Sequence, residues 1–490
     1  MAAPSKLLRS KLFWVALLCF SEGFPLGVFY EIFPVWFRQH GADLRSIGAI
    51  SLLGLAWTLK FLWAPAVDHY RHHRWWMATV EVAMGAILLG FASAAGFGPW
   101  VWAAIALFTI LSATNDIAID GYTIEFLDKN ELGLANGVRI GLYRVGMLAS
   151  GLVLILSDWI TWSGAFACGA LILAACAAMA LLAPRERVVE RVAQATLAAE
   201  LRRILIDPRL AAVVLTFALG VAALVNQVTD WSGRYPVLWR IALGVALAAL
   251  VAVWLRSRRS RPADAASPDP TQGPMFGALM ELLARPYMWP VLGFILIFKL
   301  GDASMGFMVK PFWVDAGFTA TEIGLVSVNI GLGLSIAGGF VGGWYADRVG
   351  IFKGLWVLGL FQAVSNLGYV IAAWVIPYGA GASPDTLHRA LIYTASAIES
   401  FTGGLGTAAF AAFLMAIVDK RHSATEYALL SSVFALSRSV SGWASGFGAE
   451  VLGYAPYFLL TFFLSFPAYL LLPWAKKMLA WMDAHNPPTP

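Results

Sequence analysis

The sequence predicts an all-α polytopic membrane protein with fourteen transmembrane helices: two pseudo-symmetric six-helix bundles and two extra central helices. Three observations support this prediction. Of the 490 residues, 59% are hydrophobic and only 13% are charged, whereas soluble proteins carry about 25% charged residues. Apolar stretches long enough to cross a bilayer recur along the whole chain. The two halves also repeat the same features in the same order.

The apolar stretches come as six, then two, then six, and each approaches the roughly 20 residues that a bilayer core requires. We expect helices near 12–36, 46–66, 76–96, 100–126, 134–157, 163–183, 209–226, 236–255, 288–314, 321–345, 353–377, 388–417, 425–449 and 455–475. We therefore divide the chain into an N-terminal six-helix bundle (1–184), a cytoplasmic amphipathic linker (185–208), two extra transmembrane helices (209–256), a basic cytoplasmic linker (257–286) and a C-terminal six-helix bundle (287–490).

The basic residues indicate the orientation. They concentrate in the loops that face the cytoplasm if both termini are cytoplasmic, as in the two linkers. We therefore read the net charge of +5 as a topology signal, not as a nucleic-acid surface. The basic start could belong to a signal peptide, but no small-residue cleavage site precedes Glu22. The expected location is the inner membrane, with the chain crossing it many times.

Several features occur once in each half. Pairs of matching features are Ser46-Ile47-Gly48 with Glu322-Ile323-Gly324, Asp68 with Asp347, Arg144 with Arg438, and Ser150-Gly151 with Ser445-Gly446. Repeats of six helices have the same orientation, so a pseudo-two-fold axis along the membrane normal is expected. A substrate cavity between the two bundles is the natural consequence.

One charged motif is specific to a superfamily. Gly343, Asp347, Arg348 and Gly350 have the spacing G-x3-D-R-x-G where the helix near 321–345 reaches the cytoplasm. This resembles the loop signature of the major facilitator superfamily, and the copy around Asp68 is degenerate. A carboxylate and an arginine there can hold one conformation through pairing across a gap, so we expect a gating role. The alternative is an ordinary charged loop.

A series of motifs resembles the AmpG-type muropeptide permeases. They are Glu22-Gly23-Phe24-Pro25-Leu26, Lys60-Phe61-Leu62-Trp63-Ala64-Pro65, Asn115-Asp116-Ile117 with Asp120, Tyr143-Arg144-Val145-Gly146, Lys299-Leu300-Gly301-Asp302, Ser365-Asn366-Leu367-Gly368-Tyr369 and Gly403-Gly404-Leu405-Gly406-Thr407. The resemblance implies import of anhydro-muropeptides from periplasm to cytoplasm, driven by the proton gradient. The extra helix pair departs from the family, whose best-known members place theirs after the second half. Asn115 stands where they tend to have glutamine.

Charged residues inside the helices are costly in hydrocarbon and should face a cavity or a partner. Asp116 and Asp120 are four residues apart on one helix face, and their repulsion favours a shared proton. They are our first proton-coupling candidates, followed by Glu22. The alternative is that the two aspartates pair with Arg139 or Arg144. Lys299 and Asp302 either neutralise each other or take part in coupling.

The remaining polar residues suggest a substrate site. Arg144, Arg438, Lys60 and Lys310 are candidates for binding an anionic substrate, since guanidinium groups bind both oxygens of a carboxylate. Helix–helix ion pairs are the alternative. Asn115, Gln362 and Asn366 either bond sugar hydroxyls or join helices. One of Trp36, Trp57 or Trp313 could stack on a sugar, although most tryptophans fit an interfacial belt.

Other classes of protein are disfavoured. The chain has neither a G-x4-G-K-[ST] loop nor an H-E-x-x-H motif, and no nucleophile–base set is visible. We expect no catalytic residues, no metal and no cofactor, with the proton gradient as energy source. His69, His72 and His73 are expected to be solvated. The expected partners are an anionic glycopeptide and the bilayer, without nucleic acid, and the expected state is a monomer. Alternatives are transport of an acetyl-CoA-like anion or a peptide, or a non-transporting receptor.

Overall fold

The computed structural model describes residues 11–60, 72–93, 100–126, 132–185, 285–379, 381–418 and 423–485, with a few isolated positions elsewhere. The chain forms two compact units, one of residues 1–187 and 285–490 and the other of residues 188–284. The expected extra helices at 209–226 and 236–255 lie outside the described residues, apart from scattered helical positions. All that follows concerns the first unit.

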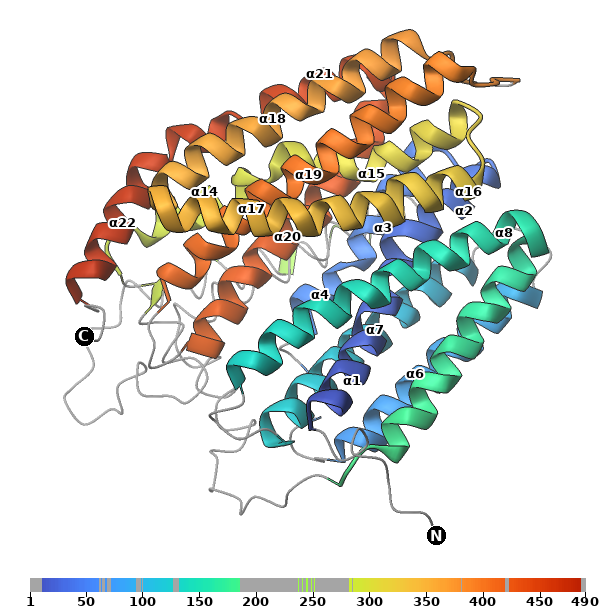
Figure 1. The fold of residues 1–490 in the computed structure, drawn as a ribbon, viewed down its shortest axis with the longest axis horizontal. Coiled ribbons are helices and arrows are strands. Elements are labelled where there is room, and N and C mark those ends of the chain that lie inside the picture. Colours follow the sequence, from blue (N-terminus) through green and yellow to red (C-terminus); the bar gives the residue numbers. More distant parts are fainter. Residues whose placement is uncertain are drawn as a thin grey trace. The chain divides into compact units, whose positions relative to one another are not determined.

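The N-terminal half of this unit is built from long apolar helices (Figure 1). Its elements are α1 (Lys11–Gly27), the π-helix η1 (Val28–Ile32), α2 (Phe33–Gln39), α3 (Leu44–Leu53), α4 (Leu55–Leu59), α6 (His73–Ser93), α7 (Trp100–Phe126) and α8 (Leu132–Leu182). The helix α8 contains non-helical residues at Ile160 and Thr161, where two helices meet at a sharp bend. It therefore accounts for both expected helices at 134–157 and 163–183.

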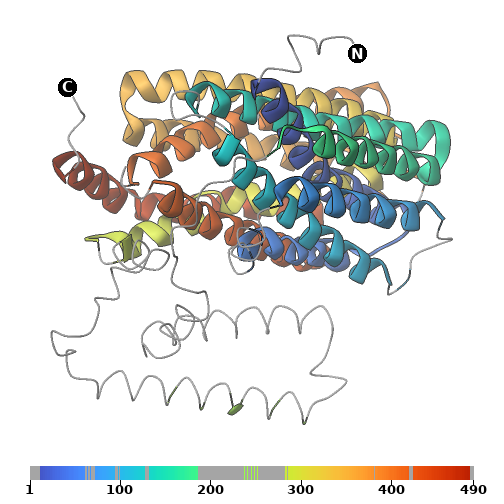
Figure 2. The same ribbon diagram turned by 90° about the horizontal axis from the view of Figure 1, so that it is seen from below.

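The C-terminal half repeats this arrangement. Its elements are α14 (Met288–Phe298), α15 (Leu300–Asp315), α16 (Ala320–Glu322), the π-helix η5 (Ile323–Ile330), α17 (Gly331–Val349), α18 (Ile351–Val375), α19 (Thr386–Ala416), α20 (Ser423–Leu452), α21 (Tyr454–Leu464), the 3₁₀-helix η7 (Pro467–Leu470) and α22 (Leu472–His485). Figure 2 shows the helices of both halves running along a common direction.

The helices have the length and polarity of membrane spans. Among the described residues, eight helices are long and apolar enough to cross a bilayer, and the bent pair α21–α22 would be a ninth. Each of the twelve helices expected in the two halves has a counterpart in α1–α8 or α14–α22. Large apolar side chains such as Trp159, Leu171 and Phe340 are exposed on the outside of the bundle. Such a surface suits lipid, so the chain is a multi-pass membrane protein.

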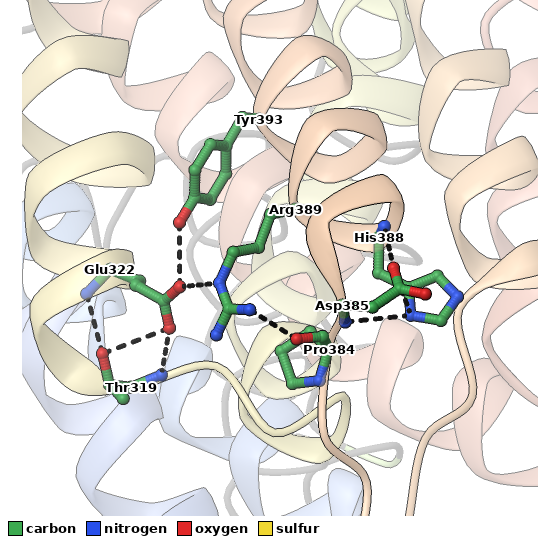
Figure 3. A network of polar contacts seen from close by, with 7 residues as sticks. All are labelled: Thr319, Glu322, Pro384, Asp385, His388, Arg389 and Tyr393. Atoms are coloured by element: carbon green, nitrogen blue, oxygen red, sulfur yellow. Dashed lines mark hydrogen bonds and ion pairs between the residues drawn. The ribbon is translucent and has the colours of Figure 1, made fainter.

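Short polar motifs determine where helices begin. The Asp43 carboxylate accepts a hydrogen bond from the Ser46 N–H at 2.6 Å at the start of α3. Thr319 and Glu322 form a capping box at the start of α16, and Glu322 also accepts from Arg389 at 2.7 Å. Figure 3 shows this network, in which Tyr393 also donates a hydrogen bond to Glu322. The network joins α16 to α19 within the C-terminal half.

We call the end of the unit that carries the α2–α3 and α15–α16 loops the outer end, after the predicted orientation. The opposite end, with the starts of α6 and α14, is the inner end. The main helix contacts between the two halves join α3 and α4 to α20, α2 and α3 to α15, and α8 to α16 and η5. Most of these segments lie toward the outer end, so the halves meet chiefly there.

Candidate functional site

Polar contacts between the halves cluster at the outer end. Arg38 forms a bidentate ion pair with Asp315 at 2.5 Å, and the Tyr454 hydroxyl donates a hydrogen bond to the same carboxylate at 2.7 Å. The Arg45 side chain lies 3.1 Å from Glu450. An open cavity of about 830 Å³ lies on this surface, lined by Arg38, Asp315, Glu450 and Tyr454 among others. Arg38–Asp315 and Arg45–Glu450 therefore join the two halves at the outer end.

Glycines bring the two halves into backbone contact just inside this layer. A Cβ on Gly48 of α3 would lie 2.8 Å from the Gly442 carbonyl and from the Gly446 amide nitrogen of α20. A Cβ on Gly324 of η5 would lie 2.8 Å from the Gly151 carbonyl of α8. The sequence repeats identified above therefore form two symmetry-related helix crossings, each of which requires a residue without a side chain.

An ion pair crosses between the halves deeper in the bundle. The Lys310 ammonium of α15 lies 2.8 Å from the Glu31 carboxylate of η1, and both side chains are mostly buried. A π-helix inserts an extra residue into a turn and is often found at functional sites. Here it carries both Glu31 and Tyr30 toward the C-terminal half. Lys310 is therefore held by a cross-half ion pair, the alternative that we left open for it.

Arg438 makes a different contact with the same π-helix. Its guanidinium carbon lies 4.5 Å from the centre of the Tyr30 ring, a cation–π contact between α20 and η1. Tyr30 also contacts Trp57 of α4 and Phe307 of α15. Among the described residues, Arg438 has no carboxylate partner within ion-pair distance. Its side chain is half-buried where α20 contacts η1 of the other half.

A second group of charges lies on the N-terminal half, toward the inner end. The Lys60 ammonium at the end of α4 lies 3.5 Å from Asp116 and 3.9 Å from Asp120 of α7. The Lys60 and Asp120 side chains are 32% and 34% exposed, so solvent reaches this group. The two aspartates share one helix face as expected, and a lysine contacts both. Among the described residues, Arg144 makes no ion pair with them.

Glu22 and Arg144 lie on neighbouring helices of the same half. Glu22 is buried on α1, and Gly23 packs against the Tyr143 backbone of α8. Tyr143 interacts electrostatically with Glu22, Asp116 and Arg438, which places these groups around one region. Arg144 follows on α8 and is half-buried. The substrate and coupling roles of these residues stay predictions.

A third group lies on the C-terminal half. The Lys299 ammonium is 3.4 Å from the Asp302 carboxylate and 3.4 Å from the Gly403 carbonyl of α19. Glu399, one turn before Gly403, interacts electrostatically with Lys299, Asp302 and Lys310. Glu399 is a charged residue inside the long helix α19. Its position beside two lysines makes it a further candidate for coupling.

Three predicted polar residues lie inside the individual halves. Asn115 is fully buried and donates to Glu81 at 3.3 Å and to the Ser21 carbonyl at 3.4 Å. Asn366 donates to Thr461 of α21 at 3.3 Å, and Gln362 packs against Gly406 of α19. These contacts join neighbouring helices, the alternative role that we gave them.

Sequence reasoning missed Glu81. This glutamate lies in the middle of α6 and is completely buried. A carboxyl group inside an apolar helix is itself a signal, and it could have been found in the expected span 76–96.

The predicted gating residues lie at the inner end. Asp347 and Arg348 are exposed, and the Arg348 guanidinium lies 4.6 Å from the centre of the Trp344 ring. A Cβ on Gly343 would meet no atom within 4 Å. Among the described residues, neither Asp347 nor Arg348 makes an ion pair. Asp68 lies outside the described residues.

One expectation about the histidines is wrong. His73 is the first residue of α6 and is only 1% exposed, against Gly121 of α7. Gly121 has no side chain, so the imidazole ring of His73 can pack directly against α7. This packing removes the ring from solvent. His72 is exposed as expected, and His69 lies outside the described residues.

Comparisons with known proteins agree with this arrangement. The sequence profile of the Major Facilitator Superfamily matches residues 15–238. The chain is 27% identical to the anhydromuropeptide permease of Escherichia coli K12, over 96% of this chain and 80% of that protein. It is 25% identical to the putative transporter AmpG 4 of Rickettsia conorii, over 94% and 95% of the two chains.

The fold also matches solved transporter structures. An auto-inhibited peptide transporter of the POT family aligns with a TM-score of 0.64 at 16% identity, over 98% of this chain and 97% of that one. At this identity the match concerns the fold alone. Together, the helix arrangement and the sequence matches make this chain similar to the AmpG-type transporters and to the Major Facilitator Superfamily.

Proposed function

We propose that this protein is a secondary active transporter that imports anhydro-muropeptides by alternating access, coupled to protons. The observation that carries the proposal is the placement of part-exposed charged side chains between two halves that are joined chiefly at the outer end. Lys60, Asp120 and Arg438 are accessible on the inner side of the glycine crossings. A space that opens toward one side at a time is what alternating access requires.

The chemistry of the site suits an anionic glycopeptide. Arg438 has no carboxylate partner among the described residues, and Arg144 makes no ion pair there either. A guanidinium group can bind both oxygens of a substrate carboxylate. The substrate class comes from a relative, because the similar protein of Escherichia coli K12 is an anhydromuropeptide permease.

The balance of charges supports proton coupling. Among the side chains that the structure describes, the acidic groups outnumber the basic ones in this region: they are Glu22, Glu31, Asp116, Asp120, Asp302 and Glu399, against Lys60, Arg144, Lys299, Lys310 and Arg438. A low-dielectric region disfavours an unbalanced negative charge, and a bound proton relieves it. Asp116 and Asp120 share Lys60, so one of this pair is our proposed proton carrier.

The test uses the purified protein in proteoliposomes with radiolabelled anhydro-muropeptide. An imposed proton gradient should drive accumulation, and an uncoupler should abolish it. Asp116→Asn/Asp120→Asn should lose gradient-driven accumulation but keep exchange of labelled for unlabelled substrate, because exchange needs no net proton movement. Asp483→Asn, at an exposed residue near the end of α22, is the matched control. Accumulation by the double variant that still responds to the gradient would refute the role of this pair.

The same preparation tests the substrate. Binding of anhydro-muropeptide should raise the melting temperature of the protein, whereas acetyl-CoA and free di- and tripeptides should not. A shift with acetyl-CoA alone would replace the proposed substrate and leave the transport fold unchanged. Absence of both binding and exchange with every compound would favour the receptor alternative.

A further inference from the structure

The aromatic residues between the halves differ from the other tryptophans of the bundle. Trp36 and Trp313 are 4% and 0% exposed and pack against aromatic rings in the core. Trp57 is half-buried, and its ring lies roughly parallel to Tyr30, at 25° with the ring centres 6.3 Å apart. Of the three tryptophans considered for sugar stacking, Trp57 is the one that stacks on Tyr30, whose ring also contacts Phe307 and Arg438 of the other half.

Trp57 and Tyr30 lie directly inside the outer closure. The Ser51 hydroxyl of α3 donates to the Ser439 carbonyl of α20 at 2.7 Å, and a Cβ on Gly54 would lie 3.5 Å from the Ser439 hydroxyl. Trp57 follows Gly54 by three residues, which is nearly one helical turn toward the inner end. The aromatic pair therefore forms part of the closed end of the space.

Two polar groups at this place lack partners among the described residues. The Trp57 indole nitrogen is buried and makes no hydrogen bond there. The Arg438 guanidinium contacts the Tyr30 ring, and no carboxylate balances it. A buried donor without an acceptor destabilises the folded protein, because it has lost its hydrogen bonds to water. Such groups in a native protein suggest that a ligand supplies the missing acceptors.

We propose that Trp57, Tyr30 and Arg438 form the saccharide subsite of this transporter, an inference that rests on the proposed function. The C–H bonds on one face of a pyranose ring carry partial positive charge and pack on the negative face of an aromatic ring. An oxygen of the sugar accepts a hydrogen bond from the Trp57 indole after a small rotation of that side chain. Arg438 binds an oxygen of the group that joins the sugar to the peptide.

The geometry also gives the substrate an orientation. Lys60 follows Trp57 by three residues on the same helix, so it lies next to Trp57 on the inner side. Part of Lys60 is exposed. The sugar then occupies the closed end, and the peptide extends toward Lys60. A peptide without a sugar has no flat apolar face for Trp57, so the subsite selects for saccharide.

The test compares two probes by isothermal titration calorimetry in detergent: the peptide-free anhydro-disaccharide and the complete anhydro-muropeptide. Trp57→Leu should weaken disaccharide binding by at least tenfold, because it removes the aromatic face. Trp57→Phe keeps a face and loses the indole donor, so a loss of about fivefold is expected, since 1 kcal/mol corresponds to about that factor. Arg438→Gln should weaken both probes.

The control is Trp159→Leu, which changes an exposed tryptophan on the outside of the bundle. Melting temperature and size-exclusion profile verify that each variant is folded. Disaccharide binding by a folded Trp57→Leu variant at the wild-type affinity would overturn the subsite. If the wild-type protein transports the muropeptide and this variant does so equally well, only the subsite fails. If the wild type binds neither probe, the proposed function fails as well.

Discussion

At the scale of single residues, two ion pairs connect the halves with opposite polarity. Glu31 of η1 faces Lys310 of α15, while Arg38 of α2 faces Asp315 at the end of the same helix. The N-terminal half contributes the acidic residue to the first ion pair and the basic residue to the second. A displacement of one helix along the other would bring like charges together. The two pairs therefore determine how α2 and α15 are aligned.

The Glu31–Lys310 pair leads to a prediction about stability. Removal of one partner from a buried ion pair typically costs about 3–5 kcal/mol, because the other charge remains buried. The side chains of Lys310 and Glu31 are 17% and 14% exposed, so they are not fully buried. We therefore expect each single substitution to cost about 3 kcal/mol or less. Glu31→Gln and Lys310→Gln should each lower the melting temperature in detergent. Glu31→Leu/Lys310→Leu should recover most of the loss, and a double variant less stable than both singles would contradict this account.

At the scale of whole helices, glycines decide which faces can meet. Gly48 and Gly324 stand at equivalent places in α3 and η5, and each contacts backbone of the other half. By contrast, Gly339 and Gly343 of α17 have open space where a Cβ would be. Glycine spacing in the sequence marks both kinds of position alike. Only the partner helix shows which glycines are required.

The contrast between the two kinds of glycine can be tested. Gly48→Val would place side-chain atoms against the α20 backbone, and overpacking typically costs about 1–3 kcal/mol. The variant should hold the outer ends of α3 and α20 apart and lose substrate accumulation in proteoliposomes. Gly339→Val, on the open face of α17, should transport like the wild type. Full activity in Gly48→Val would mean that the crossing does not limit the closed state.

At the scale of the whole molecule, the halves are joined chiefly at one end. Arg38–Asp315, Arg45–Glu450 and the bond from the Thr321 amide to Asp158 all lie at the outer end. The proposed import requires these contacts to separate when substrate enters from the outer end. In the proposed transport cycle, the structure corresponds to a state in which the halves are joined at the outer end.

Cross-linking of the outer end should stop transport. The change is Arg45→Cys with Glu450→Cys, in a chain whose native Cys19, Cys168 and Cys176 are replaced by alanine. A short bifunctional thiol reagent should then arrest substrate uptake, and reduction of a cleavable reagent should restore it. Arg45→Cys alone, treated with the same reagent, should keep its activity. Continued uptake by the cross-linked protein would show that the outer end does not have to open.

Much of the fold was predictable because hydrophobic length is a local property of the chain. The expected span 100–126 coincides with α7, and the expected span 353–377 lies within two residues of α18 (Ile351–Val375). The partners of the charged residues were less predictable. Asp116 and Asp120 were expected either to share a proton or to pair with Arg139 or Arg144. The Arg139 side chain lies outside the described residues, and the contacts add Lys60, which lies beside both aspartates. Helix rotation decides this, and it is not encoded in the spacing of residues along one helix.

The sequence alone determined the membrane class, the repeated halves and the set of intramembrane charges, because apolar length and buried charge can be read residue by residue. The tertiary structure alone decided which of these charges face one another. It joined Glu31 to Lys310 and Arg438 to Tyr30, and it enclosed Asn115, Gln362 and Asn366 within separate halves. The physical reason is that a side chain's environment in a helical bundle depends on the packing of neighbouring helices, which brings together residues far apart in the chain.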